Sequence, residues 1–144
     1  MREQDRDKLF LGIANMFASY STCLRGQTGA VIAKGGRILG TGYNGALPGM
    51  PHCKDVGCGG EVDGEFPNGC TRAVHAEANA VAFVARHGIS CVGGTIYCTH
   101  SPCFACAQLI GSAGIYRVVF SELYRITEPI ATLRKLGLVV DQVD

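Results

Sequence analysis

Four side chains suited to zinc chemistry stand in two short segments of this sequence. His75 and Glu77 lie two positions apart, and Cys103 and Cys106 form a Cys-x-x-Cys pair that directly follows Pro102. One imidazole and two thiolates can hold a zinc ion and leave its fourth position open to water, which is typical of catalytic rather than structural zinc sites. Glu77 is then placed to move protons to and from that water. The four residues predict a hydrolytic zinc centre.

The complete pattern is far more specific than its parts. A Cys-x-x-Cys pair alone also occurs in redox pairs and in halves of structural zinc sites, and both are alternatives here. His-x-Glu followed by Pro-Cys-x-x-Cys is typical of zinc-dependent enzymes that deaminate nucleobases, and the sequence carries it without a mismatch. The pattern therefore indicates hydrolytic deamination.

The composition predicts a globular protein. The chain has 144 residues, 47% of them hydrophobic and 17% charged, which suits one domain with a buried core. A net charge of +1 argues against a broad nucleic-acid surface, although one or two arginines suffice for a phosphate. The first ten residues lack the apolar core of a signal peptide, and no apolar run approaches the roughly 20 residues of a membrane span. We expect a cytoplasmic protein whose eight cysteines are thiols and metal ligands.

The first half of the chain predicts a helix, a hairpin and a long loop. The helix covers 5–19, and its expected apolar face consists of Leu9, Ile13, Met16 and Phe17. The runs TGAVIAK and RILGTGYN flank a Gly-Gly pair, which favours an antiparallel hairpin. Residues 44–74 show no period and contain seven glycines, three prolines and three cysteines. Loops of this length are usually functional or disordered, and the cysteines indicate that something ties this one down.

Helices and strands alternate in the second half. Helices are predicted over 75–87, 103–113 and 128–136, and strands over 95–99, 116–120 and 138–140. The alternation implies a largely parallel sheet with helices on its faces. With the hairpin, it predicts a single three-layer α/β/α domain over residues 1–144, built around a mixed five-stranded sheet. The helices that begin at His75 and Cys103 should then meet at one sheet edge, where their dipoles favour thiolates.

Longer stretches of the sequence resemble one family. They are GAVIAKGGRILGTGYNGALPG, His52-Cys53, HAEANAV, GTIYCTHSPCFACAQLI and AGIYRVVF. Together they resemble the deoxycytidylate (dCMP) deaminases within the cytidine deaminase superfamily, and Gly-Tyr-Asn-Gly followed by His-Cys narrows the likeness to this branch. The resemblance implies a cytidine deaminase-like fold and the hydrolysis of dCMP to dUMP and ammonia, which supplies dUMP for thymidylate synthesis.

The resemblance also assigns roles to individual positions. The catalytic zinc ligands are His75, Cys103 and Cys106. Glu77 is the proton shuttle, which passes the proton of water to ring nitrogen N3 as C4 is attacked and then helps protonate the leaving ammonia. Asn44 contacts the sugar or the base. The base pocket is lined by the backbone around Ala76 and by the loop Thr99, His100, Ser101 and Pro102. Members of the family form hexamers, and many are activated by dCTP and inhibited by dTTP, with Mg²⁺ beside the triphosphate.

Four further cysteines bracket or occupy the irregular loop. They are Cys23, Cys53, Cys58 and Cys70. Four thiolates make a closed structural zinc site, and the resemblance implies a second zinc in this region. His52 is a rival for one ligand position, and free thiols in a mobile loop are the alternative. Cys98 lies in an apolar strand and is most simply a buried small residue.

Several polar residues are candidates for substrate contacts. Arg25 can bind a phosphate bidentately, and Arg86 is a weaker candidate for a phosphate or a subunit contact. His100 could touch the phosphate or a neighbouring subunit, and Tyr124 could cap the base pocket. Each also has a plain structural interpretation as a solvated, loop or core residue. The glycines of Gly-Tyr-Asn-Gly are expected to turn the chain or to let it approach a ligand closely.

Two other functions fit parts of the pattern. Deaminases of cytidine, guanine or a base in nucleic acid share the metal motif, although the balanced charge opposes a polynucleotide substrate. A zinc-stabilised binding module without catalysis would explain the cysteines but would not require Glu77 beside His75.

Overall fold

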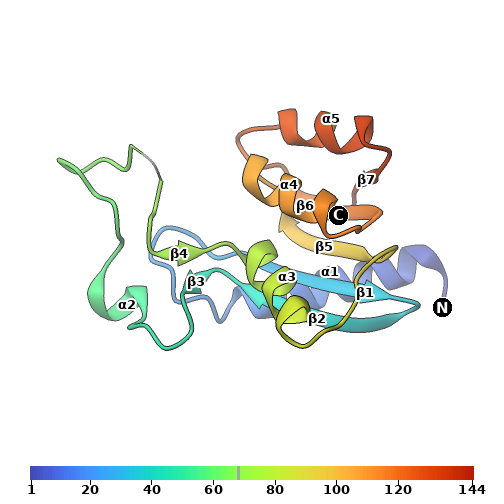
Figure 1. The fold of residues 1–144 in the computed structure, drawn as a ribbon, viewed down its shortest axis with the longest axis horizontal. Helices are drawn as coiled ribbons and strands as arrows, with labels where there is room; N and C mark the ends of the chain where they lie inside the picture. The colour runs from blue at the N-terminus through green and yellow to red at the C-terminus, as the bar shows by residue number, and fades with distance from the viewer. Residues whose placement is uncertain (68) are drawn as a thin grey trace.

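The structure is a computed structural model and describes residues 1–67 and 69–144. Its helices and strands follow the chain (Figure 1) in the order α1 Glu3–Ala18, β1 Gly29–Lys34, β2 Arg37–Tyr43, β3 Gly45–Ala46, α2 Cys53–Val56, β4 Ala73–Val74, α3 Ala76–Arg86, β5 Thr95–His100, α4 Phe104–Ser112, β6 Arg117–Glu122, α5 Glu128–Lys135 and β7 Val139–Gln142. The elements expected outside the long loop are all present, with ends shifted by one or two residues. Among the described residues, no helix combines the length and apolar character needed to cross a membrane.

Five strands form one mixed sheet in the order β2-β1-β5-β6-β7. β1 pairs antiparallel with β2 and with β5, whereas β5, β6 and β7 are parallel to one another. The mixed five-stranded sheet is confirmed. The expectation of a largely parallel sheet holds only for the three strands that alternate with helices, because β1 enters the sheet from a hairpin.

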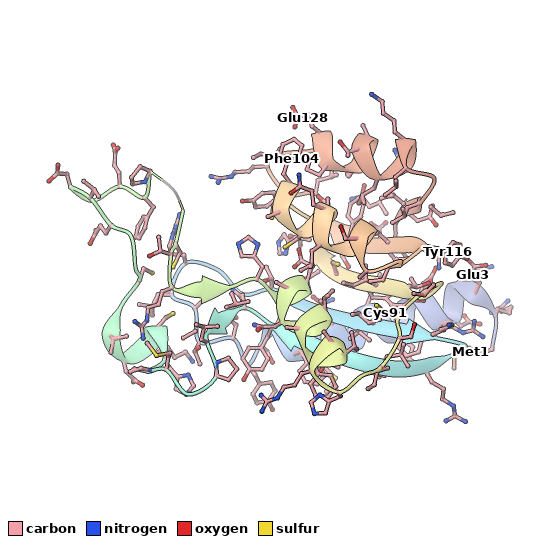
Figure 2. All side chains as sticks on the ribbon, viewed as in Figure 1. Met1, Glu3, Cys91, Phe104, Tyr116 and Glu128 are labelled. Carbon is pink, nitrogen blue, oxygen red and sulfur yellow. The ribbon has the colours of Figure 1, made fainter. Side chains whose placement is uncertain are left out.

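Helices cover both faces of this sheet (Figure 1), which confirms the three-layer fold. Alternate strand residues form the two halves of the core. Val31, Tyr97 and Val119 pack with the buried residues of α1, whereas Ile32, Ile96 and Val118 pack with those of α3, α4 and α5. The first residues of α4 and α5, Phe104 and Glu128, lie at the same end of the molecule (Figure 2).

The buried face of α1 differs from the predicted one. Leu9 and Met16 are 45% and 66% exposed, whereas the buried residues are Asp7, Phe10, Leu11, Ala14 and Ala18. The prediction is therefore wrong for two of the four residues of the expected apolar face, Leu9 and Met16. The reason is close packing against the sheet: a side chain at Gly29 would collide with the Ala14 carbonyl oxygen, so the helix turns its small residues toward β1.

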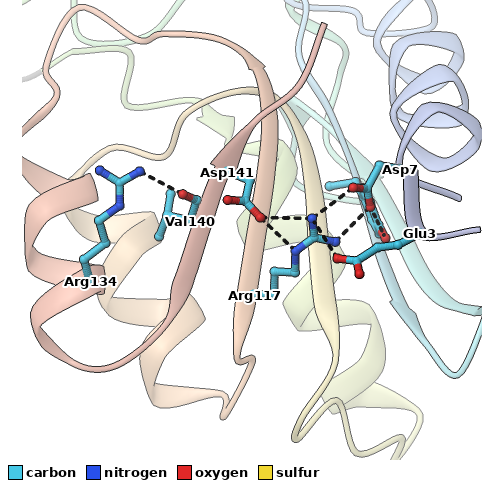
Figure 3. Close-up of polar contacts among 7 residues, drawn as sticks. Glu3, Asp7, Arg117, Arg134, Val140 and Asp141 are labelled. Atoms are coloured by element: carbon cyan, nitrogen blue, oxygen red, sulfur yellow. Dashed lines mark hydrogen bonds and ion pairs between the residues drawn. The ribbon is translucent and has the colours of Figure 1, made fainter. Parts of the chain in front are cut away.

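A cluster of ion pairs surrounds the buried first residue of β6 (Figure 3). The Arg117 guanidinium donates hydrogen bonds of 2.8 and 2.9 Å to Asp7 of α1 and of 3.0 and 3.1 Å to Asp141 of β7. Glu3 lies 3.3 Å from the same guanidinium, and the Tyr97 hydroxyl donates to Asp7 at 3.1 Å. This arginine cluster joins the first helix to the last strand, and no sequence pattern predicted it.

The segment 44–74 extends beyond the edge of the sheet (Figure 1). Over residues 44–67 and 69–74, the expected absence of regular structure is nearly correct. Its exceptions are the antiparallel pair of two-residue strands β3 and β4, the short helix α2 and a bridge between Val62 and Glu65. β3 and β4 bring the two ends of the segment together just before α3 begins.

Candidate functional site

The two segments of the zinc pattern meet where α3 and α4 begin. His75 is the N-cap of α3 and Cys103 is the N-cap of α4. Each helix therefore begins one residue later than predicted. α3 lies close to β2 because Gly42 has no side chain: a Cβ atom there would collide with the Ala76 carbonyl oxygen. Gly42 thus permits close approach to a helix, rather than to the ligand expected from the sequence.

The three predicted ligands form a compact group. His75 Nδ1 lies 3.5 Å from Cys103 Sγ and 3.4 Å from Cys106 Sγ, and all three ligand atoms lie within 4.8 Å of one another. On a tetrahedral zinc ion with Zn–N of about 2.0 Å and Zn–S of about 2.3 Å, two such ligands are about 3.5 Å apart. The donor set therefore fits zinc and leaves one position open. In residues 1–67 and 69–144, no second group of three or more His, Cys, Asp or Glu meets this distance.

The two sulfurs of this group compete for one negative charge. Hydrogen bonds from Cys106 and His75 lower the pKa of Cys103 to about 4. The hydrogen bond to Cys103 in turn raises the pKa of both His75 and Cys106 above their ordinary values. A divalent cation removes this competition, because it binds both sulfurs as thiolates and the imidazole in its neutral form.

Glu77 lies in the first turn of α3 and is only 7% exposed. Burial raises the pKa of this carboxyl above its ordinary value, while a hydrogen bond with Cys106 acts in the opposite direction. A raised pKa makes a carboxyl a stronger proton acceptor, which suits a general acid-base group. Cys98 is 1% exposed, as expected for a buried small residue.

A cavity of about 340 Å³ opens beside His75 and Glu77. Its walls are formed by Cys23, Arg25, Gly26, Thr28, Asn44, Gly69, Cys70, Ala73, His75, Glu77, His100, Ser101, Cys103, Tyr124 and Arg125. The structure therefore brings most of the predicted catalytic and substrate residues together. Four others are buried and do not line the cavity: Ala76, Thr99, Pro102 and Cys106.

Asn44 is built into the cavity wall. Its Oδ1 accepts a hydrogen bond of 2.8 Å from the Thr28 N–H, and its Nδ2 donates one of 2.9 Å to the Gly26 carbonyl. A side-chain amide has two N–H donors and two lone pairs, so one of each is left for a ligand. Asn44 thus shapes the loop before β1 and can still contact a bound molecule.

Two arginines line the cavity, and each lies over an aromatic ring. The Arg25 guanidinium is 4.1 Å from the centroid of Phe66, and that of Arg125 is 5.5 Å from the centroid of Tyr124. Sequence reasoning missed Arg125, although its position next to Tyr124 was the available signal. Two guanidinium groups at one cavity suit an anionic ligand such as a phosphate.

The four loop cysteines share one neighbourhood but do not form a group at metal-binding distance. The pKa of Cys58 is raised by desolvation and by the charges of Cys70, Cys23 and Cys53. Burial acts to raise the pKa of Cys70, but backbone N–H groups outweigh it and lower that pKa. The rival ligand His52 is exposed and precedes α2. The second zinc stays a prediction.

Arg86 lies away from the site just described. It borders a separate cavity of about 650 Å³ between the ends of β2 and α3, together with Tyr43, His52, Phe83 and His87. His87 is the C-cap of α3, as its sequence position indicated.

Comparison with known proteins agrees with this geometry. The family model of the cytidine and deoxycytidylate deaminase zinc-binding region matches residues 4–122. The chain is 44% identical over 128 residues to the deoxycytidylate deaminase of Mycobacterium phage D29, which covers 85% of this chain and 98% of that protein. It is 36% identical over 140 residues to ComE operon protein 2 of Bacillus subtilis, and the match covers 96% of this chain and 71% of that protein. The structure of a dCMP deaminase from cyanophage S-TIM5 in complex with dCMP and dUMP is similar, with a TM-score of 0.85, 32% identity and 99% coverage of both chains. The chain therefore belongs to the cytidine and deoxycytidylate deaminase family, whose zinc-binding region runs here from α1 to β6.

Proposed function

We propose that this protein is a zinc-dependent dCMP deaminase, which converts dCMP and water to dUMP and ammonia. The observation that carries the proposal is one cavity that joins the His75, Cys103 and Cys106 group to Glu77 and to two arginines. The named activity of the relatives supports it. In this proposal residues 1–144 act as one cytoplasmic deaminase domain, and the dUMP formed supplies thymidylate synthesis.

His75, Cys103 and Cys106 would hold the catalytic zinc. When bound there, zinc lowers the pKa of a water molecule at the open position enough to supply hydroxide near neutral pH. Glu77 would accept one proton of the attacking water and deliver it to N3 of cytosine while the water oxygen adds to C4. It would then take the remaining proton of the added hydroxyl group and pass it to the amino group, so that C4=O forms, the C4–N bond breaks and ammonia leaves. Burial keeps Glu77 away from bulk water during these transfers.

Arg25 and Arg125 would bind the 5′-phosphate, and Asn44 would use its free N–H and lone pair on the sugar or the base. A guanidinium can donate two parallel hydrogen bonds to one phosphate. Tyr124 would close the cavity beside Arg125. This set of contacts predicts a preference for the monophosphate over the free nucleoside.

The test is the change in ultraviolet absorbance of purified protein with dCMP, with cytidine and with dCTP in parallel. We expect rapid conversion of dCMP and slow conversion of the other two. Conversion of cytidine at the same rate would contradict the role of the arginines. No conversion of any substrate by zinc-loaded protein would contradict the proposed function.

A second zinc in the 44–74 loop belongs to the same proposal. Cys23, Cys53, Cys58 and Cys70 would be its ligands, and the low pKa of Cys70 together with its backbone N–H donors supports a thiolate at that position. Cys23 and Cys70 also line the catalytic cavity, so this metal would brace its wall. We expect two zinc ions per chain by metal analysis, falling to one in Cys58→Ser with the catalytic zinc retained.

Regulation by dCTP and dTTP, with Mg²⁺ beside the triphosphate, and assembly into a hexamer complete the proposal. The cavity bordered by Arg86, His87 and His52 supports an effector site, because its basic groups suit a polyphosphate. Light scattering checks the assembly. Rates measured with each triphosphate, with and without Mg²⁺, check the regulation, and Arg86→Ala should weaken the response.

A further inference from the structure

The ends of β5 and β6 and the residues that follow them are joined by three contacts. The Ser101 N–H donates to the Glu122 carbonyl at 2.9 Å, and the Tyr124 N–H donates to the buried Ser101 hydroxyl at 2.8 Å. The His100 Nε2 lies 3.1 Å from the Glu122 carboxylate. We name His100, Ser101, Glu122 and Tyr124 the loop latch. All except Glu122 line the catalytic cavity.

The latch continues into the sheet through Thr99. The Gly29 N–H donates to the Thr99 hydroxyl at 3.1 Å, and that hydroxyl lies 3.1 Å from His100 Nδ1. Since the hydroxyl oxygen already accepts from Gly29, its hydrogen can be donated to Nδ1. The His100 ring then donates its Nε2 hydrogen to Glu122. Every donor in this series of hydrogen bonds has an acceptor when the imidazole carries its hydrogen on Nε2.

This arrangement occupies both nitrogens of His100. The ring therefore has no remaining donor for a substrate phosphate, which is one of the two roles expected from the sequence. What the latch does hold is the segment that follows β6. Tyr124 is fixed through its backbone N–H, and Arg125, the next residue, has its guanidinium over the Tyr124 ring.

We propose that the loop latch positions Arg125 for the 5′-phosphate, so that Glu122 sets the affinity for a nucleoside monophosphate without touching it. This inference rests on the proposed function, since it concerns the phosphate end of the same cavity. Glu77 and the zinc ligands lie at the starts of α3 and α4, on other segments than Glu122. Loss of the Glu122 carboxylate is therefore expected to change substrate affinity rather than the chemical step.

The test compares Glu122→Ala with Glu122→Gln, whose amide oxygen can still accept the Nε2 hydrogen. Glu128→Ala is the matched control, because it removes an exposed carboxylate near the start of α5. The Glu122 side chain is itself 74% exposed, so its hydrogen bond with His100 is weak. We expect Glu122→Ala to raise the KM for dCMP about two- to fivefold with kcat unchanged, and the other two variants to match wild type.

Calorimetric binding of dUMP and deoxyuridine gives a second measurement that does not depend on turnover. Glu122→Ala should weaken the binding of dUMP by the same factor and leave the binding of deoxyuridine unchanged. The proposal is overturned if kcat falls instead, if both ligands weaken equally, if Glu122→Gln behaves like Glu122→Ala, or if nothing changes. Wild-type protein that binds dUMP normally but fails to convert dCMP would contradict the proposed function and leave the latch supported by the binding data.

Discussion

The two ends of the parallel strands hold their ionisable groups in opposite ways. At the start of β6, Arg117 is surrounded by Asp7, Asp141 and Glu3, which neutralise it. Beyond the end of β5, the sulfurs of Cys103 and Cys106 compete for one negative charge beside His75, and burial keeps the pKa of Glu77 raised. The first cluster is complete in the protein alone, whereas the second needs a cation.

This contrast separates stability from chemistry. Removing one partner of a paired buried charge destabilises a structure, mainly because the other charge is then left unpaired. Buried ionisable groups with shifted pKa values and a cavity beside them are instead typical of functional sites. We therefore expect substitutions at the two ends to affect different measurements.

The largest expected effect is at Glu77. Glu77→Gln removes the proton shuttle while keeping the size of the side chain, so turnover of dCMP should fall by about 10²- to 10⁴-fold. The melting temperature should not fall, because the variant no longer buries an ionisable carboxyl. Zinc content is the control and should stay at the wild-type value. A variant that retains activity would remove Glu77 from the mechanism.

The opposite result is expected at Arg117. Arg117→Met leaves Asp7 buried without its cation and should reduce the free energy of unfolding by about 3–5 kcal/mol, measured by urea denaturation. The folded variant should keep the wild-type kcat at low temperature. The matched control is the double variant Asp7→Asn with Arg117→Met, which removes both charges, keeps an acceptor for Tyr97 and should recover most of the loss. An undiminished stability in the single variant would show that the arginine cluster does not hold the helix to the sheet.

A smaller effect is expected from the arginines at the cavity. Arg25→Ala and Arg125→Ala each remove charge-assisted hydrogen bonds to the phosphate, so the KM for dCMP should rise about tenfold or more. Activity on cytidine should change little, since it has no phosphate. Arg37→Ala, at the start of β2, is the control for loss of an exposed cation. Equal losses of activity on dCMP and cytidine would show that these arginines support the fold rather than bind the phosphate.

The smallest effect is the pH dependence that arises at Tyr97. Burial and the Asp7 carboxylate raise the pKa of this tyrosine to about 12, whereas an unfolded tyrosine titrates near 10. Between these pH values the unfolded chain has released a proton that the folded chain keeps, so stability falls as pH rises. Tyr97→Phe should show a smaller fall between pH 10 and 12 in denaturant titrations. Tyr116→Phe, at an exposed position, should follow wild type.

The order of elements and the zinc ligands could be predicted because both are local signals. Glycines and helix periods mark the ends of α3 and α4, and His75, Cys103 and Cys106 belong to one motif of fixed spacing. The apolar face of α1 could not be predicted from its period, because Leu9 and Met16 are as apolar as the residues that are buried. Contact between Ala14 and Gly29 decided which face the helix presents to the sheet.

The sequence by itself determined that this chain carries a zinc-binding group with a glutamate beside it on an α/β fold. Only the tertiary structure decided what surrounds that group. Arg125 lines the cavity next to Tyr124, whose backbone N–H is bonded to Ser101. Arg117 pairs with Asp7, which lies 110 positions away in the sequence. Such contacts depend on register between distant strands, and no local pattern of residue types encodes them.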